Sequence, residues 1–296
     1  MPRHVLTIKD LGENACWLLV QQAIGTPDAK ARTDFMTERV AVLIFAQQSL
    51  SERLCVTAAV RQMGGFTVYE GEQGTWRMEL NDYQEHLMPI FGYYLDCLYT
   101  YGLPVNTWDM RTANVNFPVI NAGSPDAHPA HALADIACML RASAICRASR
   151  PPGWGAPTAL IPSSRPRPFF PFALRVALPR IWTGPAQGRG GQAANAPVTF
   201  VETPEEAVKG ANFVFAGCRG GMSAEDVGSW RLDAALMSKA NPDARLLLSA
   251  SPVEAIPVDQ KILSSPASWL VRQAEYRLRV HKRILHWVFL DNESPA

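Results

Sequence analysis

Apolar residues along the chain alternate between helical spacing and short continuous runs. Residues 10–24 carry apolar positions at helical spacing, which predicts an opening helix, and Asp10 is placed to cap it. Residues 39–45, RVAVLIF, form a continuous β-branched run of the kind found in a parallel strand that is buried on both faces. A helix is predicted to follow across 51–63 and to end at the glycine pair 64–65.

The same rhythm continues through the first half of the chain. The pattern predicts strands at 66–69 and 97–101, and helices at 80–91 and 130–142. Strands that alternate with helices predict an α/β fold with a doubly wound parallel sheet. In such a sheet, ligands bind beyond the carboxyl ends of the strands, so the loops that lead into helices are the candidate site.

A change in composition marks a domain boundary. Residues 149–197 are rich in Pro, Arg and Gly, and only 173–178 resembles a strand within them, because Pro breaks both helices and central strands. We therefore expect a first domain of residues 1–146 and a second of 147–296. The second-domain elements that the pattern predicts are strands at 198–201, 213–216 and 245–249, and helices from 204, at 232–240 and at about 266–289.

Composition and charge narrow the class of partner. The chain has 296 residues, 48% of them hydrophobic, and a formal net charge of +1. This hydrophobic content is enough for two buried cores. The net charge is too small to attract nucleic acid or an anionic membrane through the overall electrostatic field. A small-molecule ligand is the expectation. No secretory signal is visible, and the longest apolar runs fall far short of the ~20 residues of a spanning helix, so we expect a cytoplasmic protein.

The six cysteines are scattered and contain no C-x-x-C pair. This argues against a disulfide framework or a zinc knuckle, and predicts small buried apolar residues instead.

Three segments carry a specific family pattern. Residues 117–140 contain P-V-I-N followed by H-P-x-H-x-L-A-D, residues 203–215 read TPEEAVKGANFVF, and residues 265–287 include Q-A-E-Y-R-L. In this order and at these intervals they resemble the aspartate/ornithine carbamoyltransferase family, and residues 45–65 are similar to its phosphate-loop strand and helix.

The resemblance implies two doubly wound α/β domains joined by interdomain helices. It implies that the first domain binds carbamoyl phosphate or another anionic metabolite, and that the second binds an amino-acid-like acceptor. It further implies that the final helix packs back on the first domain, that the protein is a homotrimer, and that no cofactor is needed. Residues 147–197 have no convincing counterpart.

The phosphate-binding pattern of the family, S-x-R-T-R, is altered in this chain. Ser49 and Arg53 match its first and last residues, whereas Ser51 replaces the middle Arg and Glu52 introduces a negative charge. In the family a helix N-terminus, hydroxyls and guanidiniums converge there on the dianion. The Glu52 carboxylate is expected to repel phosphate strongly if it is desolvated beside it, and weakly if it turns to solvent.

The carbonyl-polarising positions are also altered. Tyr101 stands where the resemblance implies an arginine, and its hydroxyl supplies a hydrogen bond but no cation. His128 matches the family histidine that binds the carbonyl oxygen, with helix capping or packing as the alternative. His131 replaces a glutamine, which a neutral imidazole imitates in part. These two histidines would also suit a metal, but no third ligand is evident, so no metal is predicted.

Four further residues are candidate substrate-binding residues. Arg219 lies where the resemblance implies an ornithine-binding D-x-x-S-M-G loop, and its charge favours an acceptor with an extra anionic group or none. Ser251 lies in the equivalent of the H-C-L-P loop. Arg277 matches the family arginine that reaches the carbamoyl-phosphate pocket, with a solvated helix face as the alternative. Arg77 is placed similarly to the lysine-containing loop that some members lend to a neighbouring subunit.

Three functions stay open at this point. The chain is a divergent carbamoyltransferase that acts on an amino-acid-type acceptor, an inactive paralogue kept as a trimeric binding or scaffold protein, or an enzyme in which Tyr101 or His131 performs different acid–base chemistry on an amino-acid-derived substrate.

Overall fold

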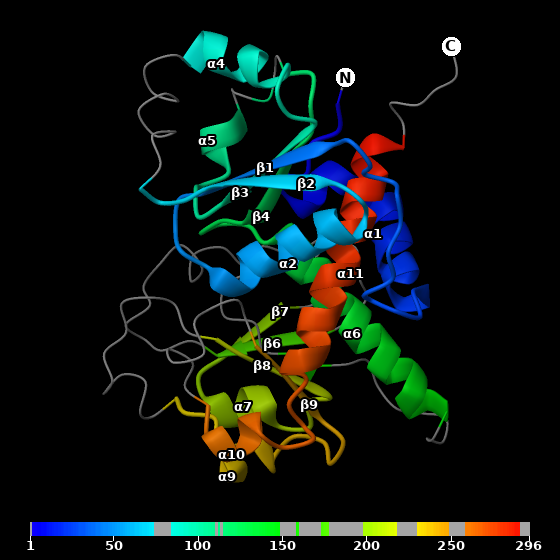
Figure 1. The fold of residues 1–296 in the computed structure, drawn as a ribbon. Coiled ribbons are helices and arrows are strands. Elements are labelled where there is room, and N and C mark those ends of the chain that lie inside the picture. Colours follow the sequence, from blue (N-terminus) through cyan, green and yellow to red (C-terminus); the bar gives the residue numbers. More distant parts are fainter. Residues whose placement is uncertain are drawn as a thin grey trace. The chain divides into compact units, whose positions relative to one another are not determined.

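The computed structural model describes residues 2–73, 84–109, 112, 115–148, 158–159, 173–177, 198–217, 230–248 and 258–290. The chain divides into two compact units: unit 1 contains residues 1–138 and 274–296, and unit 2 contains residues 139–273. Two long helices, α6 (Pro129–Ala148) and α11 (Leu270–Phe289), contribute residues to both units (Figure 1). The predicted boundary at residues 146 and 147, and the ligand assigned to each domain, stay predictions.

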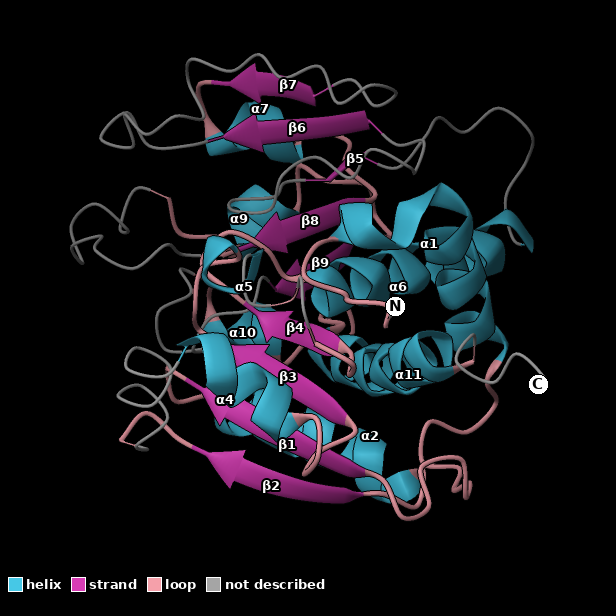
Figure 2. Ribbon diagram, turned by 90° about the horizontal axis from the view of Figure 1, so that it is seen from above, coloured by secondary structure: helices cyan, strands magenta, loops and turns pink. Residues whose placement is uncertain are grey.

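Unit 1 is built on a four-stranded parallel sheet. The strands are β1 (Val40–Phe45), β2 (Phe66–Glu70), β3 (Cys97–Tyr101) and β4 (Val119–Gly123). They lie in the order β2-β1-β3-β4 (Figure 2). The chain leaves β1 first toward β2 and then returns to the other side of β1, so the connections diverge between β1 and β3. Ligands of doubly wound sheets bind at such a point.

Helices cover both faces of this sheet. One face carries the apolar cluster of Ile44, Leu98, Met88 and Trp108, the last two from α4 (Gln84–Phe91) and α5 (Asn106–Asp109). The opposite face carries α2 (Leu50–Gln62), and Tyr99 of β3 meets α11 there. Side chains alternate across each strand, so one buried strand packs against both helix layers.

The opening helix α1 (Ile8–Gly25) corrects one prediction. Thr7, not Asp10, is the N-cap residue, and its hydroxyl accepts a hydrogen bond from the N–H of Lys9 at 3.2 Å. Asp10 occupies the third helical position and accepts the N–H of Thr7 at 2.6 Å, which makes a capping box. The helix bends at Gly12, which has a φ of +67°, a backbone conformation that glycine adopts more readily than other residues.

Unit 2 contains parallel strands in two described sheets. One has the order β5-β6-β7 and the other pairs β8 with β9. The unit 2 elements not yet placed are β5 (Thr158–Ala159), β6 (Ala173–Ala177), β7 (Val198–Val201), α7 (Pro204–Val208), β8 (Phe213–Ala216), α9 (Ala234–Met237), β9 (Arg245–Leu248) and α10 (Gln260–Leu263). The buried Gln273 amide holds the end of β9, since it accepts the N–H of Leu248 at 2.8 Å and donates to its carbonyl at 3.0 Å.

The α/β architecture with parallel sheets confirms the predicted fold class. Helix bounds differ by a few residues: α11 begins at Leu270 rather than near 266, and α9 spans four residues rather than 232–240. The short strand β5 was not predicted, because its neighbouring prolines argue against a strand. None of the helices in the described part of the chain combines the length and apolarity needed to cross a membrane. Cys16, Cys97 and Cys138 are buried, as expected.

Basic residues of α11 hold the segment that follows α1. Lys282 donates from Nζ to the carbonyls of Ala29 at 2.8 Å and Ala31 at 2.7 Å, and Arg279 donates to the carbonyl of Ala23 at 3.1 Å. The Lys282 side chain and Ala29 are buried, whereas Ala31 is exposed. α11 therefore fixes the connection between α1 and β1.

The Lys282→Met variant is expected to lose about 2–3 kcal/mol of unfolding free energy, because it removes two charge-assisted hydrogen bonds and leaves the buried carbonyl of Ala29 without its donor. Urea denaturation at pH 7 measures the loss. Lys261→Met, at an exposed position of α10, is the matched control and should stay within about 0.5 kcal/mol of the native protein. Equal stabilities of the two variants would contradict this account of Lys282.

Candidate functional site

The candidate site lies where β1, β3 and β4 end. Phe45 of β1 pairs with Tyr101 of β3, and Tyr101 pairs with Gly123 of β4, so the carboxyl ends of three strands are level. Ser49 follows β1 and His128 follows β4. Tyr101 and His128 lie 52 and 79 positions after Ser49 in the sequence. The three residues still meet at one edge of the sheet, because parallel strands end on the same side.

Ser49 begins helix α2 and caps it. Its backbone is extended, and its hydroxyl accepts the N–H of Glu52 at 3.4 Å. Tyr101 makes a side-chain hydrogen bond with Ser49, which lowers the tyrosine pKa, but burial dominates and raises it. Tyr101 is therefore a protonated phenol at neutral pH. The first N–H groups of α2 add a partial positive charge at the same place.

A cavity of about 350 Å³ opens beside the start of α2. The guanidinium of Arg53 lies over the ring of Tyr69, with 4.7 Å between its Cζ atom and the ring centroid. This contact keeps the cation at the cavity wall. The residues that line the cavity are Gln48, Ser49, Leu50, Arg53, Tyr69, Gly71, Glu72 and Gln73.

Gly123 lets two rings approach the end of β4. A Cβ atom at this position would lie 2.5 Å from Nδ1 of His128 and 2.8 Å from Cε2 of Tyr101. Any side chain would thus displace one of these rings. The backbone of Gly123 is held by Asn121, whose Oδ1 accepts its N–H at 2.9 Å. The P-V-I-N segment therefore sets the distance between Tyr101 and His128.

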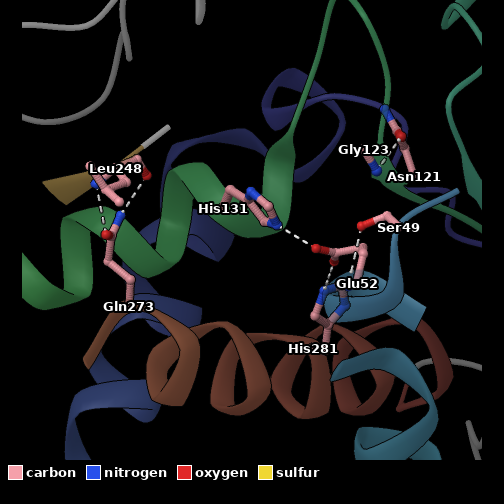
Figure 3. Close-up of polar contacts among 8 residues, drawn as sticks. All are labelled: Ser49, Glu52, Asn121, Gly123, His131, Leu248, Gln273 and His281. Atoms are coloured by element: carbon pink, nitrogen blue, oxygen red, sulfur yellow. Dashed lines mark hydrogen bonds and ion pairs between the residues drawn. The ribbon is translucent and has the colours of Figure 1, made fainter. Parts of the chain in front are cut away.

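Glu52 lies between two histidines (Figure 3). Its Oε2 is 2.6 Å from Nε2 of His131 on α6, and its Oε1 is 3.0 Å from Nε2 of His281 on α11. Glu52 is 3% exposed and His281 is 0% exposed. Three helices far apart in sequence therefore meet through one buried carboxylate.

The electrostatics favour an ionised carboxylate at Glu52. Burial opposes the charge of Glu52, but attraction and hydrogen bonds from His131 and His281 outweigh it and hold its pKa well below the ordinary value. Burial, together with the charge of Arg277, lowers the pKa of His131 against the opposing pull of Glu52. Burial and His131 lower the pKa of His128 to about 4. Both α6 histidines are thus uncharged at neutral pH.

Arg277 supplies a cation to this group of side chains. Its charge lowers the pKa of His128, His131 and Tyr101, which places the guanidinium within electrostatic range of all three. Its Nε atom is buried without a hydrogen-bond partner among the described residues. Arg277 is partly buried and not fully exposed on its helix.

The structure brings together five of the predicted site residues: Ser49, Tyr101, His128, His131 and Arg277. Arg53 lines the adjacent cavity. Ser51, the second residue of α2, is exposed. The other three predicted residues, Arg77, Arg219 and Ser251, lie outside the described residues. The roles assigned to all ten stay predictions.

Two residues of the cluster escaped sequence reasoning. Glu52 was expected beside the phosphate or in solvent, but its carboxylate turns into unit 1, and His281 was not singled out. A signal existed: Glu52 falls on the same stripe of α2 as the buried Val56, Ala59 and Val60. A carboxylate on an apolar stripe needs a buried partner.

No three His, Cys, Asp or Glu side chains within the described ranges converge as metal ligands. His128 and His131 lie side by side, with ring centroids 5.3 Å apart, but one nitrogen of His131 is already bonded to Glu52.

Comparison with known proteins gives the family. Residues 3–141 match the model of the aspartate/ornithine carbamoyltransferase carbamoyl-phosphate-binding domain. The ornithine carbamoyltransferase of Nitratidesulfovibrio vulgaris (strain DP4) is 28% identical over 304 residues, covering 98% of this chain and 100% of that protein. The family model and the full-length relatives together support the aspartate/ornithine carbamoyltransferase family for this chain. This confirms the resemblance carried by residues 117–140, 203–215 and 265–287.

Further relatives and solved structures are similar to this chain over nearly its full length. The ornithine carbamoyltransferase of Oleidesulfovibrio alaskensis is 27% identical, covering 97% of this chain and 99% of that protein. The solved structure of the Thermus thermophilus ornithine carbamoyltransferase has a TM-score of 0.79 at 19% identity and covers 97% of this chain and 99% of that one. The mitochondrial enzyme of Coccidioides immitis has a TM-score of 0.78 at 19% identity and covers 100% of both. At these identities the solved structures establish the shared fold.

The lowered histidine pKa values predict how stability depends on pH. His128 has a pKa of about 4 in the folded chain, against about 6.5 when unfolded, so the unfolded chain binds more protons between these values. The contribution of neutral His128 to the free energy of unfolding is therefore fully present above pH 6.5. It falls toward pH 4 by about 1.4 kcal/mol per pH unit for each such proton. Urea denaturation from pH 7.5 to 4 measures it. His128→Asn should flatten the curve, and an unchanged slope would contradict the assignment.

Proposed function

We propose that this chain transfers a carbamoyl group, from carbamoyl phosphate or a related anionic donor, to the amine of an amino-acid-type acceptor. The observation that carries the proposal is the convergence of Ser49, Tyr101, His128 and Arg277 at the strand ends of unit 1. The relatives named ornithine carbamoyltransferase support this class of reaction.

The donor phosphate is assigned to the start of α2. The helix N–H groups, the Ser49 hydroxyl, the Arg53 guanidinium and Arg277 are the positive or donating groups there. Because Glu52 turns inward and its oxygens accept from His131 and His281, its carboxylate is not directed at the donor. The strongest objection to an anionic donor in this site is thereby weakened.

The carbonyl of the donor is assigned to His128 and Tyr101. A neutral imidazole and a protonated phenol each donate a hydrogen bond to an oxygen that becomes negative as the amine attacks. Both stabilise the tetrahedral intermediate without an arginine. These two donors supply a weaker electric field than a cation would. We therefore expect slower turnover than in a site with an arginine at position 101.

The test combines binding with turnover. Calorimetric titration of the full chain with carbamoyl phosphate, and with a bisubstrate analogue that carries a phosphonate, measures the anion site. Phosphate release with a panel of amino acids and amines measures transfer. Arg277→Gln is expected to weaken binding about 10-fold or more, as for a lost charge-assisted contact, whereas Arg272→Gln, exposed on the same helix, should not.

The outcomes separate the candidate functions. Binding with phosphate release supports transfer. Binding of the analogue without release for any amine would favour the alternative of a non-catalytic binding protein. Absence of binding would remove the proposal. The homotrimer that the family resemblance implies belongs to the same proposal, and light scattering of the purified chain tests it.

A further inference from the structure

The Glu52 cluster has a feature that the transfer reaction outlined above does not use. An ionised carboxylate accepts hydrogen bonds and donates none, so both histidine nitrogens that contact Glu52 must carry protons. His131 and His281 are therefore protonated on Nε2. Because His131 is neutral, its Nδ1 atom carries a lone pair and acts as a proton acceptor.

That lone pair has no partner in the described residues. Nδ1 of His131 is buried and makes no hydrogen bond, and the same is true of Nδ1 of His128. The two rings lie 5.3 Å apart near the start of α6, next to the close approach of His128 and Tyr101 at Gly123. A buried acceptor without a partner costs about 1–3 kcal/mol, so Nδ1 of His131 points to a ligand that donates to it.

Fold stability alone does not account for the cluster. Position 52 lies on the buried stripe of α2 with Val56 and Val60, where an apolar side chain would pack. Apolar replacements of buried ionic groups are often neutral or stabilising. Glu52 instead holds one ring orientation of His131, and His281 occupies the second carboxylate oxygen so that the carboxylate does not rotate (Figure 3).

We propose that Glu52, seated by His281, is a positioning residue that fixes the proton of His131 on Nε2, and that Nδ1 of His131 accepts the proton of the attacking amine. The inference rests on the proposed function. As the amine nitrogen bonds to the carbonyl carbon, its proton passes to Nδ1 and an imidazolium forms. The bond from that carbon to the phosphate oxygen then breaks, and the proton leaves with the phosphate.

The charges that face His131 suit this exchange. Arg277 from α11 favours the neutral base before reaction, and the neutral His128 adds no charge. Glu52 from α2 and Asp135 from α6 favour the imidazolium that forms. The Glu52 carboxylate, 2.6 Å from Nε2, gives the larger stabilisation because it also accepts a hydrogen bond.

The first readout is independent of turnover. The full chain, labelled with ¹⁵N-histidine, reports through ¹H–¹⁵N correlation spectra which nitrogen of each ring carries the proton. We expect Nε2–H for His131 and His281 at pH 7. Glu52→Gln should abolish this preference at His131 and lower its pKa, since an amide does not stabilise the imidazolium. Glu275→Gln removes a carboxylate paired with Arg279 on α11 and should leave both histidines unchanged.

The second readout is the pH profile of kcat for phosphate release from carbamoyl phosphate. Glu52→Gln is expected to lower kcat by about 10²–10⁴-fold and move its acidic limb to lower pH, with KM for the donor nearly unchanged. Glu52→Asp, which keeps the charge, should recover part of the loss. Glu275→Gln should keep the native profile.

The two readouts decide between outcomes. A proton on Nδ1 of His131 in the native chain, or a Glu52→Gln variant with native His131 pKa and native kcat profile, would overturn the inference. If native protein shows the Nε2–H form but transfers to no amine, the proposed function fails and the proton-acceptor role fails with it, while positioning of His131 by Glu52 stands.

Discussion

His128→Ala is expected to slow phosphate release from carbamoyl phosphate by about 10²–10³-fold in kcat, the usual loss when one donor to a developing oxyanion is removed. His128 is uncharged in the folded chain because its pKa is about 4, so it donates a hydrogen bond at neutral pH without requiring protonation. KM for the donor should change much less than kcat, because the contact strengthens only as the oxygen becomes negative.

The control for this variant is His286→Ala, a histidine of α11 that stacks on Phe35 outside the site, with ring centroids 3.9 Å apart. Its kcat should stay native. Far-ultraviolet circular dichroism and urea denaturation establish that both variants fold. A folded His128→Ala variant that keeps native kcat would show that His128 only packs its helix, which is the alternative left open by its sequence position.

Glu52→Ala is expected to destabilise the protein by about 3–5 kcal/mol at pH 7, because it leaves two buried imidazole N–H groups without an acceptor and opens a void in α2. The pKa of Glu52 is depressed in the folded chain, so its contribution is complete above its unfolded pKa of about 4.3 and is lost as pH falls. The difference from the native protein should therefore shrink below pH 4. Urea denaturation at pH 7 and at a pH below 4 measures both values.

Two further variants test the reason for this loss. Glu13→Ala, at an exposed position of α1, should stay within about 0.5 kcal/mol of the native protein. Combined replacement of Glu52, His131 and His281 by Leu should be far less destabilising than Glu52→Ala alone, because no polar atom is left unpaired. A triple variant as unstable as Glu52→Ala would show that volume, and not hydrogen bonding, causes the loss.

Much of the fold follows from patterns that are local in sequence. The buried run at 39–45 and the glycine pair at 64–65 identify β1 and the end of α2 to within a residue or two, because apolar periodicity and backbone freedom act over a few neighbouring positions. The family resemblance of residues 117–140 led to the prediction that His128 and His131 are site residues, and the structure places their rings side by side. Thr7 was missed as a cap because Asp10 satisfies the local capping rule almost as well.

The direction of the Glu52 carboxylate was not local information. Its effect on an anionic donor depends on whether it faces the cavity, solvent or the interior, and that choice depends on His131 and His281, 79 and 229 positions away. Burial of Arg277 likewise depends on how α11 packs on α2 and α6. Sequence position alone could not distinguish these cases, because desolvation and ion pairing are properties of the packed structure.

The sequence by itself determined the family, the parallel α/β fold and the edge of the sheet at which Ser49, Tyr101 and His128 meet, since strand ends and helix starts are coded by neighbouring residues. Only the tertiary structure decided that Glu52 turns inward and is stabilised as a carboxylate by hydrogen bonds from two histidines. The physical reason is that the free energy of a charge depends on the groups that surround it in space, and three distant helices supply those groups.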